Sequence, residues 1–153
     1  MKNVILLCYK GLGANLLHLS YCHQIYDKYG PVTIITLCKN LKEVLYNDPK
    51  IAEVIFLDQY YKKFSDILNL SKFLSSQKID NMFIFYPSIR FFLASKLAKI
   101  KNIKCYPFFS KKNLHLVKAA KKFTEKILNI DNCSTETRIF IDKNILEIGR
   151  AHV

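Results

Sequence analysis

The chain has 153 residues, the size of one domain, and half of them are hydrophobic. This composition supports a packed core and excludes an intrinsically disordered chain. The net charge of +12 fits an anionic partner, although a genome rich in A and T would produce the same excess of lysine without one. Because the lysines are spread along the chain without a nucleic-acid motif, we do not expect nucleic acid as the partner.

The cysteines and the apolar runs bear on the cellular location. The five cysteines are widely spaced and form no C-x-x-C pair, which is typical of reduced thiols in a cytosolic protein. No apolar run approaches the roughly 20 residues of a membrane helix. The first residues lack the pattern of a signal peptide. We therefore expect a cytoplasmic protein.

The chain opens with a strand, a loop and a helix. Val4 to Tyr9 is a continuous apolar run, typical of a strand buried on both faces. Lys10 to Ala14 follows as a tight loop, and Asn15 to Tyr29 has the apolar spacing of a helix. We predict that Asn15 caps the start of this helix and that Gly30-Pro31 ends it.

Strand-like and helical patterns then alternate along the chain. The predicted strands are 32–37, 54–57, 81–86 and 103–108, with 137–141 either a sixth strand or the start of a crossing to a further domain. The first predicted helix is 40–46, with a capping box of Asn40 and Glu43. The next has an inner face of Phe64, Ile67, Leu68, Phe73 and Leu74. Two more helices are predicted at 89–100 and 114–128. This alternation predicts an α/β fold with a Rossmann-like, doubly wound, mostly parallel sheet.

Basic, polar and aromatic residues follow the carboxyl ends of the predicted strands, where open α/β sheets bind their ligands. The candidates for substrate binding are Lys10, Gly11, Gly13, Asn15, Tyr61, Lys62, Lys63, Ser88, Arg90 and Lys112. Asp58, which closes the third strand, is the best-placed carboxylate for a general base. The alternatives are solvated loop charge for the lysines, a helix cap for Ser88 and a turn cap for Asp58.

Two of the four glycines of the chain, Gly11 and Gly13, lie together after the first strand. They predict either a sharp turn without a ligand or a close approach of a ligand to the backbone. The pattern lacks the third glycine of the dinucleotide fingerprint, so we expect no nicotinamide cofactor. His18 and His23 lack the spacing and the third ligand of a metal site, and we expect no metal.

The segment Gly11-Leu12-Gly13-Ala14-Asn15-Leu16-Leu17, followed by Asn47-Asp48-Pro49 and by the run from Glu53 to Asp58, resembles the N-terminus of glycosyltransferase family 9, the bacterial heptosyltransferases. The resemblance covers about the first sixty residues. It implies the GT-B fold, in which two Rossmann-like domains face each other across a cleft. The N-terminal domain holds the acceptor, and the C-terminal domain holds the sugar nucleotide.

The resemblance also implies a reaction. An ADP-heptose-like donor, bound by a second domain, would give its sugar to a lipopolysaccharide core or a related anionic glycan or glycolipid. Neither a cofactor nor a firmly bound metal is implied, and contact with the cytoplasmic face of the inner membrane is expected. Lys62 and Lys63 match the position of basic residues that contact acidic groups of the acceptor in this family.

The sequence departs from the family where the proposed general base stands. The family has an aspartate after the second glycine, whereas this chain has Ala14 followed by Asn15. Neither side chain accepts a proton from a hydroxyl at neutral pH. Three alternatives follow: the base lies elsewhere, the acceptor chemistry differs, or the protein is not catalytic.

The last seven residues, 147–153, read like the translation of a sequencing-adapter oligonucleotide. We therefore expect residues 1–146 to be one acceptor-binding domain of a longer protein, inactive without its second domain. The alternatives are a stand-alone Rossmann-like or flavodoxin-like module that binds a phosphate or a nucleotide, and a non-catalytic GT-B protein.

Overall fold

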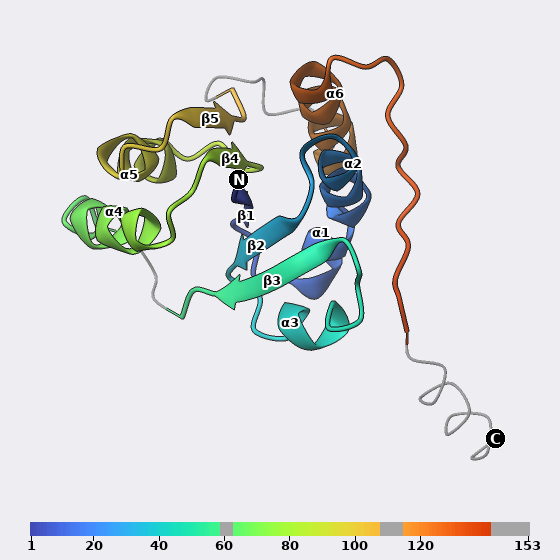
Figure 1. Cartoon of the computed structure of the whole chain (residues 1–153), viewed down its shortest axis with the longest axis horizontal. Coiled ribbons are helices and arrows are strands. Elements are labelled where there is room, and N and C mark those ends of the chain that lie inside the picture. The colour runs from blue at the N-terminus through green and yellow to red at the C-terminus, as the bar shows by residue number, and fades with distance from the viewer. Residues whose placement is uncertain (59–62, 108–114, 142–153) are drawn as a thin grey trace.

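The computed structural model describes residues 1–58, 63–107 and 115–141. Five parallel strands form one sheet in the order β3-β2-β1-β4-β5 (Figure 1), which confirms the predicted α/β, Rossmann-like class. The strands are β1 (Asn3–Leu7), β2 (Val32–Thr36), β3 (Ile51–Phe56), β4 (Asn81–Ile84) and β5 (Asn102–Cys105). The helices are α1 (Leu12–Leu16), α2 (Leu19–Tyr29), α3 (Leu41–Val44), α4 (Asp66–Ser76), α5 (Ile89–Leu97) and α6 (Leu116–Leu128).

The helices cover both faces of the sheet, because each strand carries apolar side chains on both sides. Figure 1 shows α4 and α5 on one face and α1, α2, α3 and α6 on the other. Every residue of β1 and β2 is buried, and each face has its own hydrophobic core. Within the described ranges, no helix is long and apolar enough to cross a bilayer.

A ladder of three asparagines fixes the register at the amino ends of β1, β4 and β5. Asn3, Asn81 and Asn102 are direct neighbours across the sheet. The Asn81 amide donates to Asn3 Oδ1 at 2.8 Å, and the Asn102 amide donates to Asn81 Oδ1 at 3.0 Å. The Asn3 amide in turn donates to the Tyr29 carbonyl at the end of α2, at 2.8 Å. Because a shift of β4 by one residue would break both bonds that Asn81 makes, the ladder selects one register.

The helix predicted from Asn15 is two helices, and Asn15 does not cap either of them. Gly11 is the N-cap residue of α1. The helical conformation is interrupted at Leu17 and His18, and α2 begins after them. The His18 ring nitrogen Nδ1 forms a hydrogen bond with the Ala14 carbonyl at 2.7 Å. The His18 backbone N–H therefore donates to the Asn15 carbonyl instead of the Ala14 carbonyl. The end of α2 is as predicted, since Gly30 has φ 86° and its N–H bonds to the Tyr26 carbonyl.

Two other expectations for the helices are wrong. Asn40 precedes α3, but its side chain makes no capping hydrogen bond, so the predicted capping box is absent from this helix. In α4 the buried residues include Ile67, Leu70 and Leu74, whereas Leu68 is exposed. Phe64 precedes the helix and is exposed as well, so neither residue lies on the predicted inner face.

The motif Asn47-Asp48-Pro49 serves the packing between α2 and the start of β3. Asp48 is buried, and its Oδ2 lies 2.7 Å from His23 Nε2 on α2. Its Oδ1 accepts a hydrogen bond from the Lys50 backbone N–H at 3.0 Å, which closes the turn before β3. This pair therefore fixes the turn against the helix.

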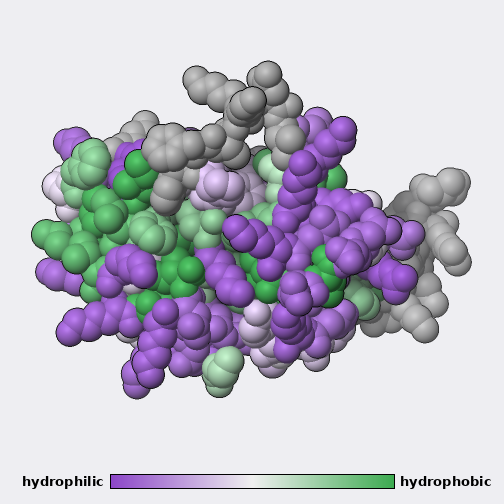
Figure 2. Space-filling view, turned by 90° about the horizontal axis from the view of Figure 1, so that it is seen from above, coloured by the Kyte–Doolittle hydropathy of each residue, from purple (hydrophilic) through white to green (hydrophobic). Residues whose placement is uncertain are grey.

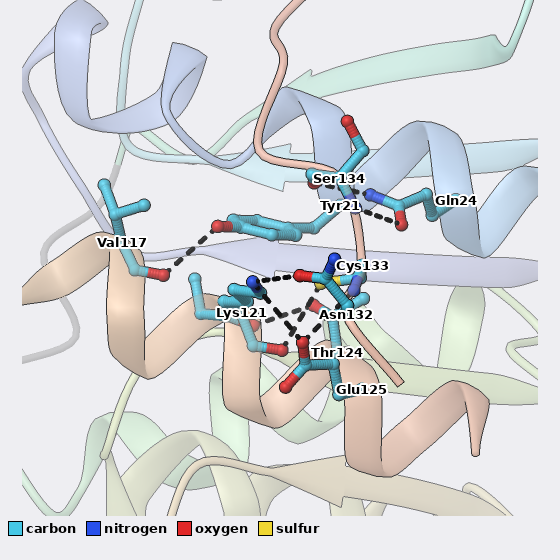
Figure 3. Close-up of polar contacts among 10 residues, drawn as sticks. Tyr21, Gln24, Val117, Lys121, Thr124, Glu125, Asn132, Cys133 and Ser134 are labelled. Carbon is cyan, nitrogen blue, oxygen red and sulfur yellow. Dashed lines mark hydrogen bonds and ion pairs between the residues drawn. The ribbon is translucent and has the colours of Figure 1, made fainter. Parts of the chain in front are cut away.

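Residues 133–141 run along α2, outside the sheet (Figure 1). Of the two alternatives for 137–141, the sixth strand is therefore wrong. Cys133 is buried where this segment meets α2 and α6, and its backbone N–H donates to Glu125 at 3.1 Å. Figure 3 shows the Gln24 amide bonded twice to the Ser134 backbone. These bonds satisfy backbone groups that a strand would have paired within the sheet.

We predict that Asn81→Ala lowers the free energy of unfolding by about 1–3 kcal/mol, because it leaves the buried Oδ1 of Asn3 without its donor. Asn102→Ala is the matched control, since it removes only the bond at the exposed end of the ladder and should cost about 1 kcal/mol or less. Urea denaturation measures both values. Equal losses in the two variants would contradict the ladder as the source of register stability.

Candidate functional site

The sheet order places a topological switch point between β1 and β4. From β1 the chain continues into α1 and α2 on one face, and from β4 it continues into α5 on the other face. The two loops diverge at the carboxyl ends of these strands. The space outside this edge, called here the crevice, is where an open α/β sheet usually binds its ligand. Residues 9–13 and 86–90 border it.

Tyr9 links the two strands at the base of this crevice. Its hydroxyl donates to the Phe85 carbonyl at 2.9 Å, and its ring stacks on His18 with a centroid distance of 4.9 Å. The ring of Tyr86 meets the ring of Tyr9 edge-on, with a centroid distance of 5.6 Å. Burial, and then the neighbouring Cys8, raise the pKa of Tyr9, so its hydroxyl stays protonated and keeps donating at physiological pH.

Asn15 holds the loop that follows β1. It is buried, and its amide nitrogen donates to the Tyr9 carbonyl at 2.9 Å and to the Gly11 carbonyl at 2.7 Å. Its Oδ1 accepts from the Thr36 hydroxyl at 2.8 Å, and Thr36 Oγ1 accepts from the Cys38 backbone N–H at 3.0 Å. The polar atoms of Asn15 are thus bonded within the protein and join the loops after β1 and β2.

Gly11 and Gly13 are not required by the conformation of the loop. Gly11 has φ −74° and ψ 136°, Gly13 lies within α1, and among the described glycines only Gly30 has a positive φ. Among the residues that the structure describes, a Cβ atom added to Gly11 or to Gly13 would meet nothing within 4 Å. Of the two alternatives, a turn that needs glycine is not observed, and the close approach of a ligand to the backbone stays a prediction.

His18 supports the loop from below. It is buried, and because the Ala14 carbonyl can only accept, Nδ1 carries the proton and Nε2 is the acceptor. Nε2 has no hydrogen-bond partner. Burial lowers the pKa of His18, and the bond to Ala14 opposes this shift. The ring is therefore a neutral packing element between Tyr9 and Phe85.

The remaining predicted site residues lie at the same edge of the sheet or outside the described ranges. Ser88 is the N-cap of α5, and its hydroxyl accepts from the Phe91 N–H at 3.4 Å, which fits the alternative of a helix cap. Lys10 and Lys63 are exposed and Arg90 is half-buried. Tyr61, Lys62 and Lys112 lie outside the described residues.

Asp58 is exposed and follows β3, the outermost strand on its side. Two strand spacings separate β3 from β1, so Asp58 lies roughly 10 Å along the edge from the Gly11 loop. A small acceptor held by that loop would not reach its carboxylate, whereas an oligosaccharide lying across β1, β2 and β3 would. The position thus suits a base only for an extended acceptor.

The cysteines near this edge are poor nucleophiles. Burial raises the pKa of Cys8, and it raises the pKa of Cys105 to about 11, so both are thiols at neutral pH. In the part of the chain that the structure describes, His, Cys, Asp and Glu residues form no cluster able to hold a metal ion. The described side chains therefore offer hydrogen bonds, charge and aromatic surface.

Tyr9 and Thr36 were missed by the sequence reasoning, although each stands at the carboxyl end of a predicted strand. Each looks like an ordinary strand residue in the sequence. A polar side chain that ends an otherwise apolar strand was the available signal, because that position borders the ligand edge of a parallel sheet.

The comparisons with known proteins agree with this fold. A glycosyltransferase of family 9 from Veillonella parvula aligns with 99% of the chain at a TM-score of 0.68 and 17% sequence identity. The ADP-heptose LPS heptosyltransferase II of E. coli aligns with 99% of the chain at a TM-score of 0.69 and 11% identity. A scan against protein-family models found no match, and neither did a search of curated proteins.

The chain spans about half the length of these two proteins, since it covers 49% of the first and 50% of the second. At these identities the likeness establishes the fold. The chain has the fold of one half of a family 9 glycosyltransferase, in agreement with the resemblance of its first sixty residues.

We predict that the stability of the protein falls on acidification through His18. The unfolded chain binds a proton as the pH falls through about 6.5, whereas burial holds the pKa of folded His18 lower. The unfolded state then binds more protons, so the free energy of unfolding decreases below about pH 6.5. His18→Phe keeps the aromatic contact and removes this titration.

Urea denaturation of both proteins at about pH 7.5 and about pH 5.5 measures the effect. The wild type should lose more stability between the two values than His18→Phe does. The same loss in both proteins would show that His18 is not the group responsible.

Proposed function

We propose that residues 1–146 are the N-terminal, acceptor-binding half of a GT-B glycosyltransferase of family 9. The observation that carries this proposal is the pair Gly11 and Gly13 at the switch point, where neither backbone conformation nor packing against the described residues requires glycine. Glycine in a helix costs about 0.5–1 kcal/mol relative to alanine, so a ligand close to the backbone is a reason to retain it. The fold shared with two glycosyltransferases makes a glycan acceptor the fitting ligand.

The acceptor would lie along the carboxyl edge of the sheet. Lys10, Lys63 and Arg90 border this edge, and Lys62 and Lys112 follow β3 and β5 in sequence, so anionic groups of a lipopolysaccharide core would find cations there. Tyr61 would offer an aromatic face to a sugar ring. The rigid base made by Tyr9 and Asn15 would hold the acceptor without moving itself.

The reaction would be an inverting displacement. A hydroxyl of the acceptor would attack the anomeric carbon of a heptose or hexose, while a second domain held the ADP-type diphosphate and stabilised its leaving charge. Transfer therefore requires both halves, and residues 1–146 alone should be inactive. We place the complete enzyme in the cytoplasm, in peripheral contact with the inner membrane where a glycolipid acceptor would lie.

The general base is the open part of the mechanism, because the family aspartate is replaced by Ala14. We propose Asp58, which stands at the same edge and is exposed to an extended acceptor. Ala14 also favours a second candidate function, a GT-B protein that binds glycans and does not transfer them. The transferase and the glycan-binding protein differ in the expected effect of a substitution at Asp58, which would lower sugar transfer only in the transferase.

We predict opposite effects of Gly13→Ala on stability and activity in the complete two-domain protein. The added methyl group meets nothing in the protein, so it should stabilise α1 by about 0.5–1 kcal/mol. The same methyl group would displace the acceptor and lower kcat/KM for sugar transfer by about tenfold or more. Thermal denaturation and a transfer assay measure the two effects.

Gly30→Ala is the matched control, because Gly30 has φ 86° at the end of α2 and lies away from the crevice. It should lower stability and leave transfer by the folded protein unchanged. Full activity of Gly13→Ala would remove the main support for a ligand at this loop.

We predict that Asp58→Asn lowers kcat for transfer by about 10²-fold or more if Asp58 is the base, since an amide cannot take up the proton of the hydroxyl. The melting temperature should not change, because the side chain is exposed. Ala14→Asp restores a carboxylate at the position used by the family. Unchanged turnover in Asp58→Asn excludes Asp58, and transfer that appears only in Ala14→Asp identifies a glycan-binding protein that has lost its base.

A further inference from the structure

Most of the net charge comes from one stretch of the chain. Residues 81–124 contain ten of the 24 Lys and Arg residues and none of the 12 Asp and Glu residues, so they supply +10 of the net charge of +12. This stretch contains β4, α5, β5 and most of α6. Because β4 and β5 are the last two strands on one side of the sheet, the charge is concentrated at the β5 end of the molecule.

The helix α5 has a hydrophobic stripe on its outer face. Ile89, Leu93 and Leu97 recur every four residues and are 52%, 39% and 55% exposed. Phe91 and Ala94, on the opposite side of the helix, are buried in the core beneath the sheet. A helix on the surface of a globular protein ordinarily has polar residues on its outer face. Figure 2, which looks down on the β5 end, shows hydrophobic residues gathered on the side of α4 and α5.

Exposed lysines continue from this stripe across the β5 end. Lys96, Lys99 and Lys101 lie on α5 and on its connection to β5, and all three are exposed. Beyond them, a groove of about 750 Å³ separates β5 from α6. Its lining includes the apolar Ile103, Phe123 and Ile127 and the basic Lys104, Lys122 and Lys126.

We infer that this face, made by α5, β5 and α6 and called here the β5 face, docks onto a lipid bilayer with anionic headgroups. The stripe of Ile89, Leu93 and Leu97 would enter the boundary between headgroups and acyl chains, and the lysines would lie against the headgroups. Apolar residues flanked by cations, without an acidic residue in the same stretch, are the composition that such a surface requires. The inference holds whether or not the protein transfers a sugar.

The charge and the exposed apolar side chains argue against two other partners for this face, a second copy of the chain and a nucleic acid. A twofold dimer through it would bring two stretches of +10 together, and Glu125, the acidic residue of α6, already lies 3.8 Å from Lys121 of its own chain. A nucleic acid would use the lysines, but it would leave the three exposed aliphatic side chains of α5 in water. A bilayer with anionic lipids satisfies both parts of the surface.

The test is co-sedimentation of the full chain with vesicles of phosphatidylcholine and phosphatidylglycerol in equal parts, against vesicles of phosphatidylcholine alone. We expect binding to the anionic vesicles only, and a loss of about tenfold in partition for Leu93→Gln with Leu97→Gln. Lys99→Gln with Lys101→Gln should cause a similar loss. Both pairs are exposed, so circular dichroism and melting temperature should match the wild type.

The matched controls are Tyr46→Gln, an 83% exposed aromatic residue after α3, and Lys39→Gln with Lys42→Gln, which removes two exposed charges at the other end of the sheet. These variants should bind vesicles like the wild type. Three results would overturn the inference: no binding to anionic vesicles, equal binding by the leucine variant, or a dimer or an oligonucleotide complex that the leucine variant abolishes. A transfer assay is not involved, so this outcome bears on the proposed membrane contact and leaves the proposed sugar transfer to its own test.

Discussion

The site depends on one side chain, the buried amide of Asn15. It donates to two carbonyl groups of the loop after β1 and accepts from Thr36 at the end of β2. A loop at the edge of a sheet has backbone groups that no ladder pairs, and a buried unpaired group costs about 1–3 kcal/mol. Because Asn15 satisfies these groups from inside, the outer side of the loop stays open. The position of Gly11 and Gly13 relative to the sheet follows from these bonds.

The aromatic base of the crevice works with this amide. Tyr9 joins β1 to the carbonyl of Phe85 after β4, and His18 packs beneath it. The bond between His18 and the Ala14 carbonyl interrupts the helical ladder and divides α1 from α2. The break is thus part of the support of the loop, because a continuous helix would need that carbonyl for its own hydrogen bond.

The order and type of the elements could be predicted from the sequence, because each buried strand is a short apolar run and each helix has a repeating stripe. The contacts that shape the site could not. The sequence shows Asn15 beside an apolar stripe, where a cap is the common role, but its partner Thr36 is on another strand. The extended segment at 137–141 has the composition of a strand, and only its contacts with α1 and α2 exclude it from the sheet. Both errors come from partners distant in sequence.

The replacement of the family aspartate by Ala14 is consistent with the shape of this loop. Gly11, Gly13 and Ala14 give it the smallest side chains available, and the polar groups that stabilise it lie beneath, on Asn15 and His18. Such a loop can admit a bulky acceptor to the backbone, but it contributes no group able to take up a proton. Catalysis would then depend on a carboxylate brought from farther along the edge or from a second domain. The shape of the loop does not depend on a carboxylate at position 14, so the proposed glycan binding does not require one.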